Sequence, residues 1–130
     1  MSTGPSSKPY TITFEQREGY LYARVEGPFD SYEISNAYWQ EVAEECQKTQ
    51  NRKLLLDERL DSVMPSMTEV FQGASERCHM GLAGIKIAFV DSLSDHHEFN
   101  LFGELVATNR GLYCKVFNNL KQGENWLLAD

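Results

Sequence analysis

The sequence predicts an α/β protein whose core is a five-stranded mixed sheet packed with four helices. Two stretches near the N-terminus alternate apolar and polar residues, which is the period of a strand with one buried face. The rest of the chain alternates helix-like segments with short apolar runs, as expected for parallel strands that helices cover. We therefore expect an N-terminal antiparallel hairpin followed by parallel strands.

The hairpin is predicted from residues 10–16 and 20–26, with Gly19 in the turn between them. Three further strands are predicted at residues 53–57, 85–91 and 112–117, where the sequence reads KLLLD, IKIAFVD and LYCKVF. Because each later strand follows a helix-like segment, right-handed crossover connections are expected between them.

Four helices are predicted from apolar residues at helical spacing. The first runs from about residue 31 to 49, the second follows Ser66, the third ends before Gly111, and the fourth follows Asn119. Residue pairs three positions apart predict their N-terminal caps. These pairs are Asp30–Glu33, Ser66–Glu69, Asp95–Glu98 and Asn119–Gln122.

Length and composition indicate one domain at residues 10–130, preceded by a flexible leader at residues 1–9. The leader lacks the apolar core of a signal peptide, and no apolar run is long enough to span a membrane. A net charge of −7 disfavours nucleic acid as a partner. The three cysteines are widely spaced and odd in number, which favours a reducing, cytoplasmic location without disulfides.

Asp57 and Asp91 each follow an apolar strand, so both are expected at the carboxyl edge of the parallel sheet. Ligands favour that edge in open α/β sheets, and two acids there could hold Mg²⁺. Alternatively, Asp57 pairs with Arg59 or caps loop amides. A ligand pocket between sheet and helices would be lined by aromatic residues, for which the candidates are Phe71, Phe99 and Phe102.

No catalytic motif is present. Adjacent residues on a helix point about 100° apart, so His96 and His97 do not converge on one metal ion. Cys78 and His79 are adjacent, but Cys78 belongs to the apolar stripe of its helix, which favours a core role. Neither a phosphate-binding glycine loop nor a nucleophile elbow occurs. We therefore expect no enzyme activity, no metal and no cofactor.

The order of elements and the residues at the strand ends resemble the STAS-like domains, the anti-sigma-factor antagonist family with its uncharacterised bacterial branch. The resemblance rests on DSYEIS, KLLLDERLD, IKIAFVD and the closing NRGLYCKVFNNLKQGENWLL, and covers about residues 10–128. It implies a phosphoacceptor serine at the start of the helix after the third strand. Ser66 matches that position best and Ser62 second, although the family's Asp-Ser-Ser-Gly sequence is replaced by DSVMPSM.

The leading functional prediction is a regulatory domain that binds a protein partner or a second copy of itself. Tyr20 and Tyr22 are candidate interface residues on the hairpin, unless they cover the sheet beneath a helix. The first alternative is a carrier or sensor of a small ligand such as a lipid or nucleotide. The second, weaker alternative is a Mg²⁺-assisted hydrolase that uses Asp57 and Asp91.

Overall fold

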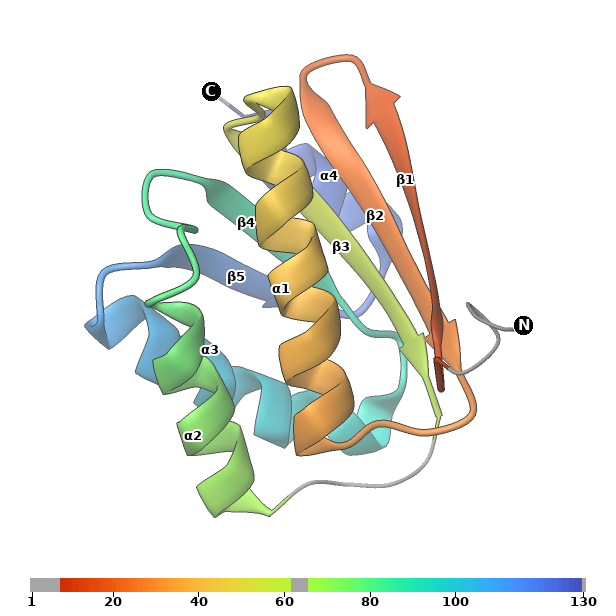
Figure 1. Cartoon of the computed structure of the whole chain (residues 1–130), viewed down its shortest axis with the longest axis vertical. Coiled ribbons are helices and arrows are strands. Elements are labelled where there is room, and N and C mark those ends of the chain that lie inside the picture. The colour runs from red at the N-terminus through yellow and green to blue at the C-terminus, as the bar shows by residue number, and fades with distance from the viewer. Residues whose placement is uncertain (1–7, 62–65, 130) are drawn as a thin grey trace, which may run out of the picture.

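The five-stranded sheet predicted from the sequence is present in the computed structural model, which describes residues 8–61 and 66–129 (Figure 1). The strands lie in chain order, with the first pair antiparallel and every later pair parallel. The predicted fold class is therefore confirmed. The strands are β1 (Thr11–Arg17), β2 (Tyr20–Gly27), β3 (Lys53–Leu60), β4 (Lys86–Val90) and β5 (Tyr113–Phe117).

Four α-helices and one short 3-10 turn connect or follow these strands. They are α1 (Tyr32–Thr49), α2 (Met67–Arg77), η2 (Ser94–His96), α3 (His97–Asn109) and α4 (Leu120–Leu127). Within the described part of the chain, none of the helices is both long and apolar enough to cross a lipid bilayer.

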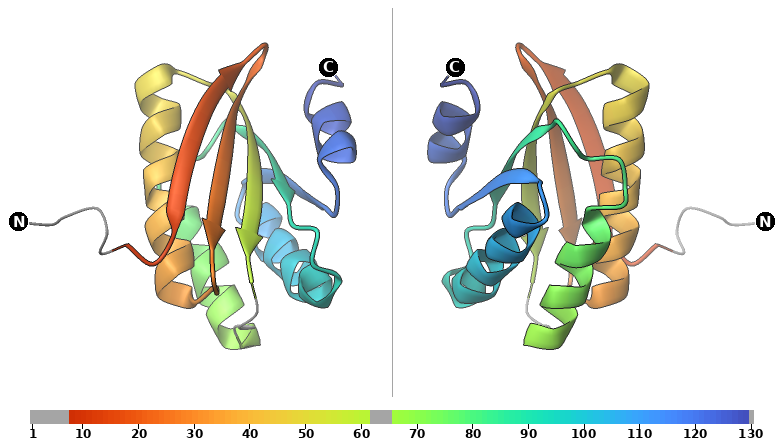
Figure 2. Two further views of the ribbon diagram at one scale, coloured as in Figure 1. Left: turned by 90° about the vertical axis from the view of Figure 1, so that its right-hand side faces the viewer. Right: turned by 90° about the vertical axis from the view of Figure 1, so that its left-hand side faces the viewer.

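The chain order of the strands determines which face of the sheet each helix covers. A right-handed crossover between neighbouring parallel strands always places its helix on the same face. The three crossover helices α1, α2 and α3 therefore share one face, whereas α4 follows the last strand and packs on the other (Figure 2). The molecule thus has three layers, of which the α4 layer is the smallest.

Two apolar cores correspond to these two faces. The larger core lies between the sheet and the crossover helices and is centred on Leu54, Leu56, Tyr38 and Val42. The smaller core lies between the sheet and α4 and has six buried residues: Tyr20, Tyr22, Leu55, Ala88, Val90 and Leu127. The alternation of Leu54, Leu55 and Leu56 between the two cores shows that β3 is buried on both faces, as its continuous apolar run predicts.

Two of the four predicted helix caps are confirmed. Ser66 and Glu69 form a capping box, in which the serine hydroxyl accepts from the Glu69 N–H and the glutamate accepts from the Ser66 N–H. The Asn119 side chain accepts from the Gln122 N–H at 2.9 Å and caps α4.

The other two predicted caps are wrong. Ser31 caps α1 by accepting from the Ile34 N–H at 3.1 Å, and Asp30 instead accepts from the Ser31 N–H. At the third helix, Asp95 lies in the 3-10 turn and His96 occupies the cap position without a side-chain cap. The spacing alone could not show that each helix begins one residue later than the acid suggests.

The third strand is also longer than predicted. It continues through Asp57 to Leu60, so that strand alternation extends over the sequence LDERL. Asp57 then faces the α4 side together with Leu55, while Glu58 faces the crossover helices together with Leu56 and Leu60. This alternation places two adjacent acids on opposite faces of the sheet.

Candidate functional site

A pocket lies between the sheet and the crossover helices, near the carboxyl ends of the parallel strands. The N-terminal half of α1 and residues along most of α2 and α3 form one wall, and the helix-facing residues of β3, β4 and β5 form the other. Much of the lining is apolar and includes Trp39, Val70, Ile87, Phe89, Phe99 and Val116. The fold therefore encloses a cavity of the kind that binds small molecules in other proteins.

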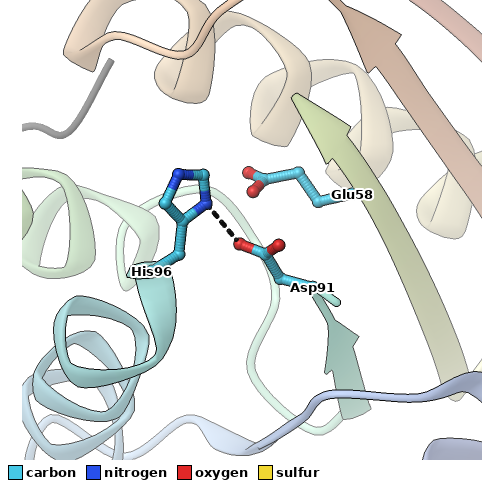
Figure 3. Close-up of side chains that lie close together, drawn as sticks. All are labelled: Glu58, Asp91 and His96. Carbon is cyan, nitrogen blue, oxygen red and sulfur yellow. Dashed lines mark hydrogen bonds and ion pairs between the residues drawn. The ribbon is translucent and has the colours of Figure 1, made fainter. Parts of the chain in front are cut away.

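Glu58 and His96 line this pocket, and Asp91, which is not among the lining residues, lies next to both, so three polar side chains from separate segments come together there. Glu58 comes from β3, Asp91 directly follows β4, and His96 ends the 3-10 turn before α3, and all three point toward one another (Figure 3). One ligand atom from each lies within 4.8 Å of the others. They are 4%, 3% and 6% exposed, so this acid–imidazole cluster is buried.

Hydrogen bonds hold Asp91 in a fixed position. Its Oδ1 accepts from the Leu93 N–H at 3.1 Å, and its Oδ2 accepts from the Asn100 amide at 3.0 Å. The Nδ1 atom of His96 lies 2.9 Å from the same Oδ2. Asp91 therefore ties the loop after β4 to the first turn of α3 and orients the imidazole ring.

The acidic residues on the described lining of the pocket are Asp30, Glu58, Glu69 and Glu104. The buried hydroxyl of Tyr38 donates a hydrogen bond to Glu58. Asp30 lines the same pocket, and its Oδ1 accepts from the Ser31 N–H at 2.8 Å. Three carboxyl groups, from Asp30, Glu58 and Asp91, thus influence one another electrostatically in a partly apolar environment.

The electrostatics of the pocket disfavour carboxylate charge. Burial raises the pKa of Glu58 well above its usual range, and the charges of Asp30 and Asp91 raise it further. Burial also raises the pKa of Asp30 to about 6, although the Ser31 N–H and the charge of Arg77 act in the opposite direction. These acids are therefore stabilised by a proton or by another positive charge.

Donor groups line the pocket as well. The Arg77 guanidinium stacks over the Trp39 ring at 4.9 Å and donates to the Ser35 hydroxyl at 3.0 Å. The buried indole N–H of Trp39 and the Nε–H of Arg77 have no hydrogen-bond partner among the residues that the structure describes. Buried donors without partners are uncommon, and each is a candidate contact for a bound molecule.

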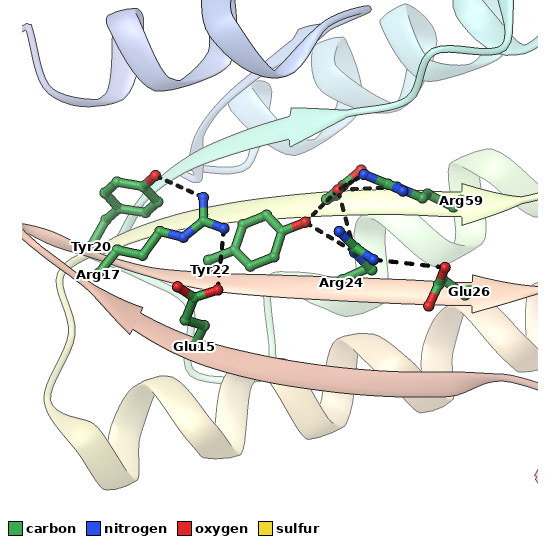
Figure 4. A network of polar contacts seen from close by, with 8 residues as sticks. Glu15, Arg17, Tyr20, Tyr22, Arg24, Glu26 and Arg59 are labelled. Carbon is green, nitrogen blue, oxygen red and sulfur yellow. Dashed lines mark hydrogen bonds and ion pairs between the residues drawn. The ribbon is translucent and has the colours of Figure 1, made fainter.

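Asp57 and Asp91 do not form a joint site, because their side chains lie on opposite faces of the sheet. Asp57 accepts from the Tyr22 hydroxyl at 2.5 Å and from Arg59 Nη2 at 2.9 Å, and Arg24 Nε lies 3.9 Å away. Figure 4 shows Tyr22, Arg24 and Arg59 within a polar network on the α4-side face of β1, β2 and β3. The alternative pairing of Asp57 with Arg59 is the arrangement present in the structure.

The predicted aromatic residues are divided between different environments. Phe99 lines the pocket, whereas neither Phe71 nor Phe102 is among the lining residues. Phe71 is exposed and lies under the guanidinium of Arg110. Phe102 is half-buried. Only one of the three predicted aromatics therefore lies where a pocket ligand would contact it.

Tyr20 and Tyr22 are buried rather than surface residues. They are 2% and 5% exposed and belong to the core beneath α4. The Tyr20 hydroxyl donates to Glu124 of α4 at 2.7 Å. The alternative in which these tyrosines cover the sheet beneath a helix is what the structure contains.

The cysteines show no sign of an activated nucleophile. All three are free, and burial raises the pKa of the Cys46 and Cys114 thiols to about 11. The Cys78 thiol donates to the Ala74 carbonyl at 3.5 Å within its own helix.

Ser66 lies exposed at the start of α2, and Ser62 is outside the described residues. Replacing Ser66 by alanine is expected to lower the free energy of unfolding by about 1 kcal/mol, because the capping box loses its hydroxyl. Urea titration of Ser66→Ala beside Thr68→Ala, an exposed position in the same turn, measures this. Equal stability of the two variants would show that the cap contributes nothing.

Comparison with known proteins gives no indication of the function, so a functional inference rests on the geometry of the site. No protein-family model, curated protein or solved structure matches the chain. The fold and the site together define an α/β domain with a buried acid–imidazole cluster at an otherwise largely apolar pocket. Such a cluster can bind a cation, exchange a proton, or orient an imidazole as a base.

Proposed function

We propose that this domain binds a small, positively charged ligand in the pocket between the sheet and α1, α2 and α3. The observation that supports this most directly is a group of acids at a pocket with largely apolar walls: Asp30 and Glu58 line the pocket, and Asp91 lies next to Glu58. A buried carboxylate needs a compensating positive charge, and Arg77 and His96 are the cationic residue types on the described lining. A cationic ligand would supply the remaining charge.

The size of the pocket limits what it accepts. The centre of a water molecule can reach about 100 Å³ of it. One buried water needs roughly 10–15 Å³ by this measure, so the pocket has room for several waters or for a ligand of a few heavy atoms. This supports a small amine or a hydrated ion as the ligand and favours the sensor form of the carrier-or-sensor hypothesis over transport of a whole lipid.

The proposed ligand is compatible with a regulatory domain of STAS-like type. The support for that type is the hairpin followed by helix–strand units, together with Ser66 at the start of α2. In such a domain a ligand would act by closing α1, α2 and α3 around the pocket. A change in the helix positions could then be read by a partner.

A second candidate function, protein binding or self-association, is favoured by exposed apolar side chains on two neighbouring helices. Met67 and Phe71 lie on α2, and Leu101 and Leu105 lie on α3, and all four are at least 43% exposed. Two helices that pack together and both expose large apolar residues are suited to contact with another protein. This candidate and ligand binding do not exclude each other.

Native mass spectrometry of the full chain purified from its own host tests the proposal, since it reports bound ligand and oligomeric mass together. In solution, the Trp126→Phe variant is titrated with small primary and quaternary amines and with divalent metal chlorides. The fluorescence of Trp39, its remaining tryptophan, reports binding. One of the cations is expected to bind at a single site and to raise the melting temperature.

A substitution that fills the pocket tests the location of the site, and a substitution on the outer side of the same helix is its matched control. Gly103 lines the pocket from α3, and the nearest atom to an added Cβ is a Val70 methyl at 3.5 Å. Gly103→Leu should abolish ligand binding, while Thr108→Leu on the exposed side of the same helix should not. Equal binding by both variants, or no response to any cation, would refute the proposal.

A further inference from the structure

We infer that Glu58, Asp91 and His96 form a binding site for a divalent transition-metal ion of the Zn²⁺ or Mn²⁺ class. This inference rests on the proposed cation binding and identifies the cation. Two carboxylate oxygens and one imidazole nitrogen within 4.8 Å of one another can reach a common ion at bond lengths of about 2.0–2.2 Å with small side-chain movements. The directions of the three side chains in Figure 3 are those of ligands around a shared centre.

The backbone holds these ligands at fixed positions. Asp57 and Val90 are register partners in the parallel β3–β4 ladder, so the next residues, Glu58 and Asp91, lie side by side at its end. The Asp91 N–H donates to the Phe117 carbonyl at 3.0 Å and extends the ladder to β5. The Asp91 side chain accepts hydrogen bonds from the Leu93 N–H in the loop and from the Asn100 amide in α3. His96 lies between these two donors in the chain and is thereby held next to the pair. The ligand set is thus preorganised by three parts of the fold.

Further hydrogen bonds orient the proposed ligands. The Asn100 amide donates to Asp91, and the Tyr38 hydroxyl donates to Glu58. In metal sites, outer contacts of this kind fix the ligating carboxylates and adjust their basicity. Their presence on both acids distinguishes this cluster from a chance group of surface carboxylates.

An independent observation on the same pocket also indicates a bound group. The Trp39 side chain is 4% exposed and lines the pocket, yet its indole N–H lacks an acceptor in the described structure. A water or another oxygen ligand of the ion would provide that acceptor. Glu58 and His96 also line the pocket, so the coordination positions that the protein does not fill would face its interior.

The ligand types determine the class of ion. Mg²⁺ and Ca²⁺ prefer six or more oxygen ligands, whereas imidazole nitrogen suits Zn²⁺ and related first-row ions. One imidazole beside two carboxylates therefore favours a transition metal over Mg²⁺. Only the first residue of the His96–His97 pair takes part, since the partners of His96 are Glu58 of β3 and Asp91 directly after β4 rather than residues of its own helix.

Isothermal titration of the chelator-treated full chain with ZnCl₂, MnCl₂ and MgCl₂ tests the inference. Zn²⁺ or Mn²⁺ should bind one per chain and at least tenfold more tightly than Mg²⁺. Glu58→Gln keeps the volume of the side chain, and His96→Ala removes the ring; each should weaken binding at least tenfold. Circular dichroism and urea unfolding show whether each variant folds. If His96→Ala does not fold, the result for Glu58→Gln decides the test.

Matched controls lie next to the proposed ligands. His97→Ala, Asp57→Asn and Cys78→Ser should each leave the affinity for the metal unchanged, since none of these side chains belongs to the cluster. Substitution with Co²⁺ gives a second readout, because its visible absorption bands should change in Glu58→Gln and not in Asp57→Asn.

The outcomes separate this inference from the proposed function. Metal binding that survives Glu58→Gln, or equal affinity for Mg²⁺, would overturn the inference. If no metal binds but an amine does and Gly103→Leu blocks it, the inference fails and the proposed function holds. If neither a metal nor an amine binds, both fail.

Discussion

Replacing Asp30 by asparagine is expected to make the metal-free protein more stable than wild type at pH 7, by up to about 3 kcal/mol. The pKa of Asp30 is raised from 3.8 to about 6 in the folded protein, mainly by burial. Each unit of such a shift corresponds to about 1.4 kcal/mol of differential stability between the two protonation states. Asparagine is neutral at every pH and can still accept from the Ser31 N–H through its side-chain oxygen.

The sign of the effect follows from the direction of the shift. The folded protein binds the Asp30 proton more tightly than the unfolded chain, so this group favours folding below about pH 3.8. That contribution is lost as the pH rises toward 6 and is absent above it. The stability difference between Asp30→Asn and wild type should therefore be small at pH 4 and reach its full size above pH 6.

Urea unfolding at several pH values between 4 and 8, with a chelator present, measures this difference. Asp61→Asn is the matched control, because Asp61 directly follows β3 and is exposed, so burial does not affect its carboxylate. A constant difference across the pH range, or a loss of stability at pH 7, would show that burial of Asp30 does not control its titration.

Replacing Leu127 by alanine is expected to lower the free energy of unfolding by about 2–5 kcal/mol. Leu127, the last residue of α4, is fully buried against the sheet, where it packs with Tyr20, Tyr22 and Leu55. Truncating a buried leucine removes its apolar contacts and leaves a cavity, and this range is typical of such changes. Because α4 is a helix of eight residues on a small core, its docking depends strongly on this one side chain.

Leu128→Ala is the matched control, since Leu128 is the adjacent residue and is 43% exposed. It should change the unfolding free energy by less than about 1 kcal/mol. Hydrogen exchange distinguishes local from global effects: loss of protection confined to α4 would show undocking of the helix. Equal effects of the two substitutions would contradict the assignment of Leu127 as the main contact of α4.

The fold was predictable because its signals are local. The alternation of residues 10–26 and the apolar runs at Lys53 and Ile85 depend on neighbours in sequence, and the crossover rule then limits the topology. Helix starts were less predictable, since Asp30 and Asp95 have the correct spacing for caps but other residues occupy those positions.

The candidate site was harder to predict because it depends on where β3 ends. If Asp57 is the last residue of the strand, Asp57 is the predicted site acid; because β3 continues to Leu60 and each further residue reverses the face, Glu58 faces the pocket instead. A signal was present: Leu56, Glu58 and Leu60 alternate with Asp57 and Arg59, which predicts a buried glutamate if the strand continues. The proximity of Glu58 to His96 joins segments 38 positions apart, and no local pattern encodes it.

The order of the strands also has a consequence for how the chain acquires its structure. Every strand pairs with the one before it, so during synthesis each new strand can add to an edge that already exists. The exception is α4, whose Glu124 meets Tyr20 at a separation of 104 residues. Until α4 emerges from the ribosome, Leu55, Ala88 and Val90 lack their cover, and the nascent domain presents an apolar surface that chaperones can recognise.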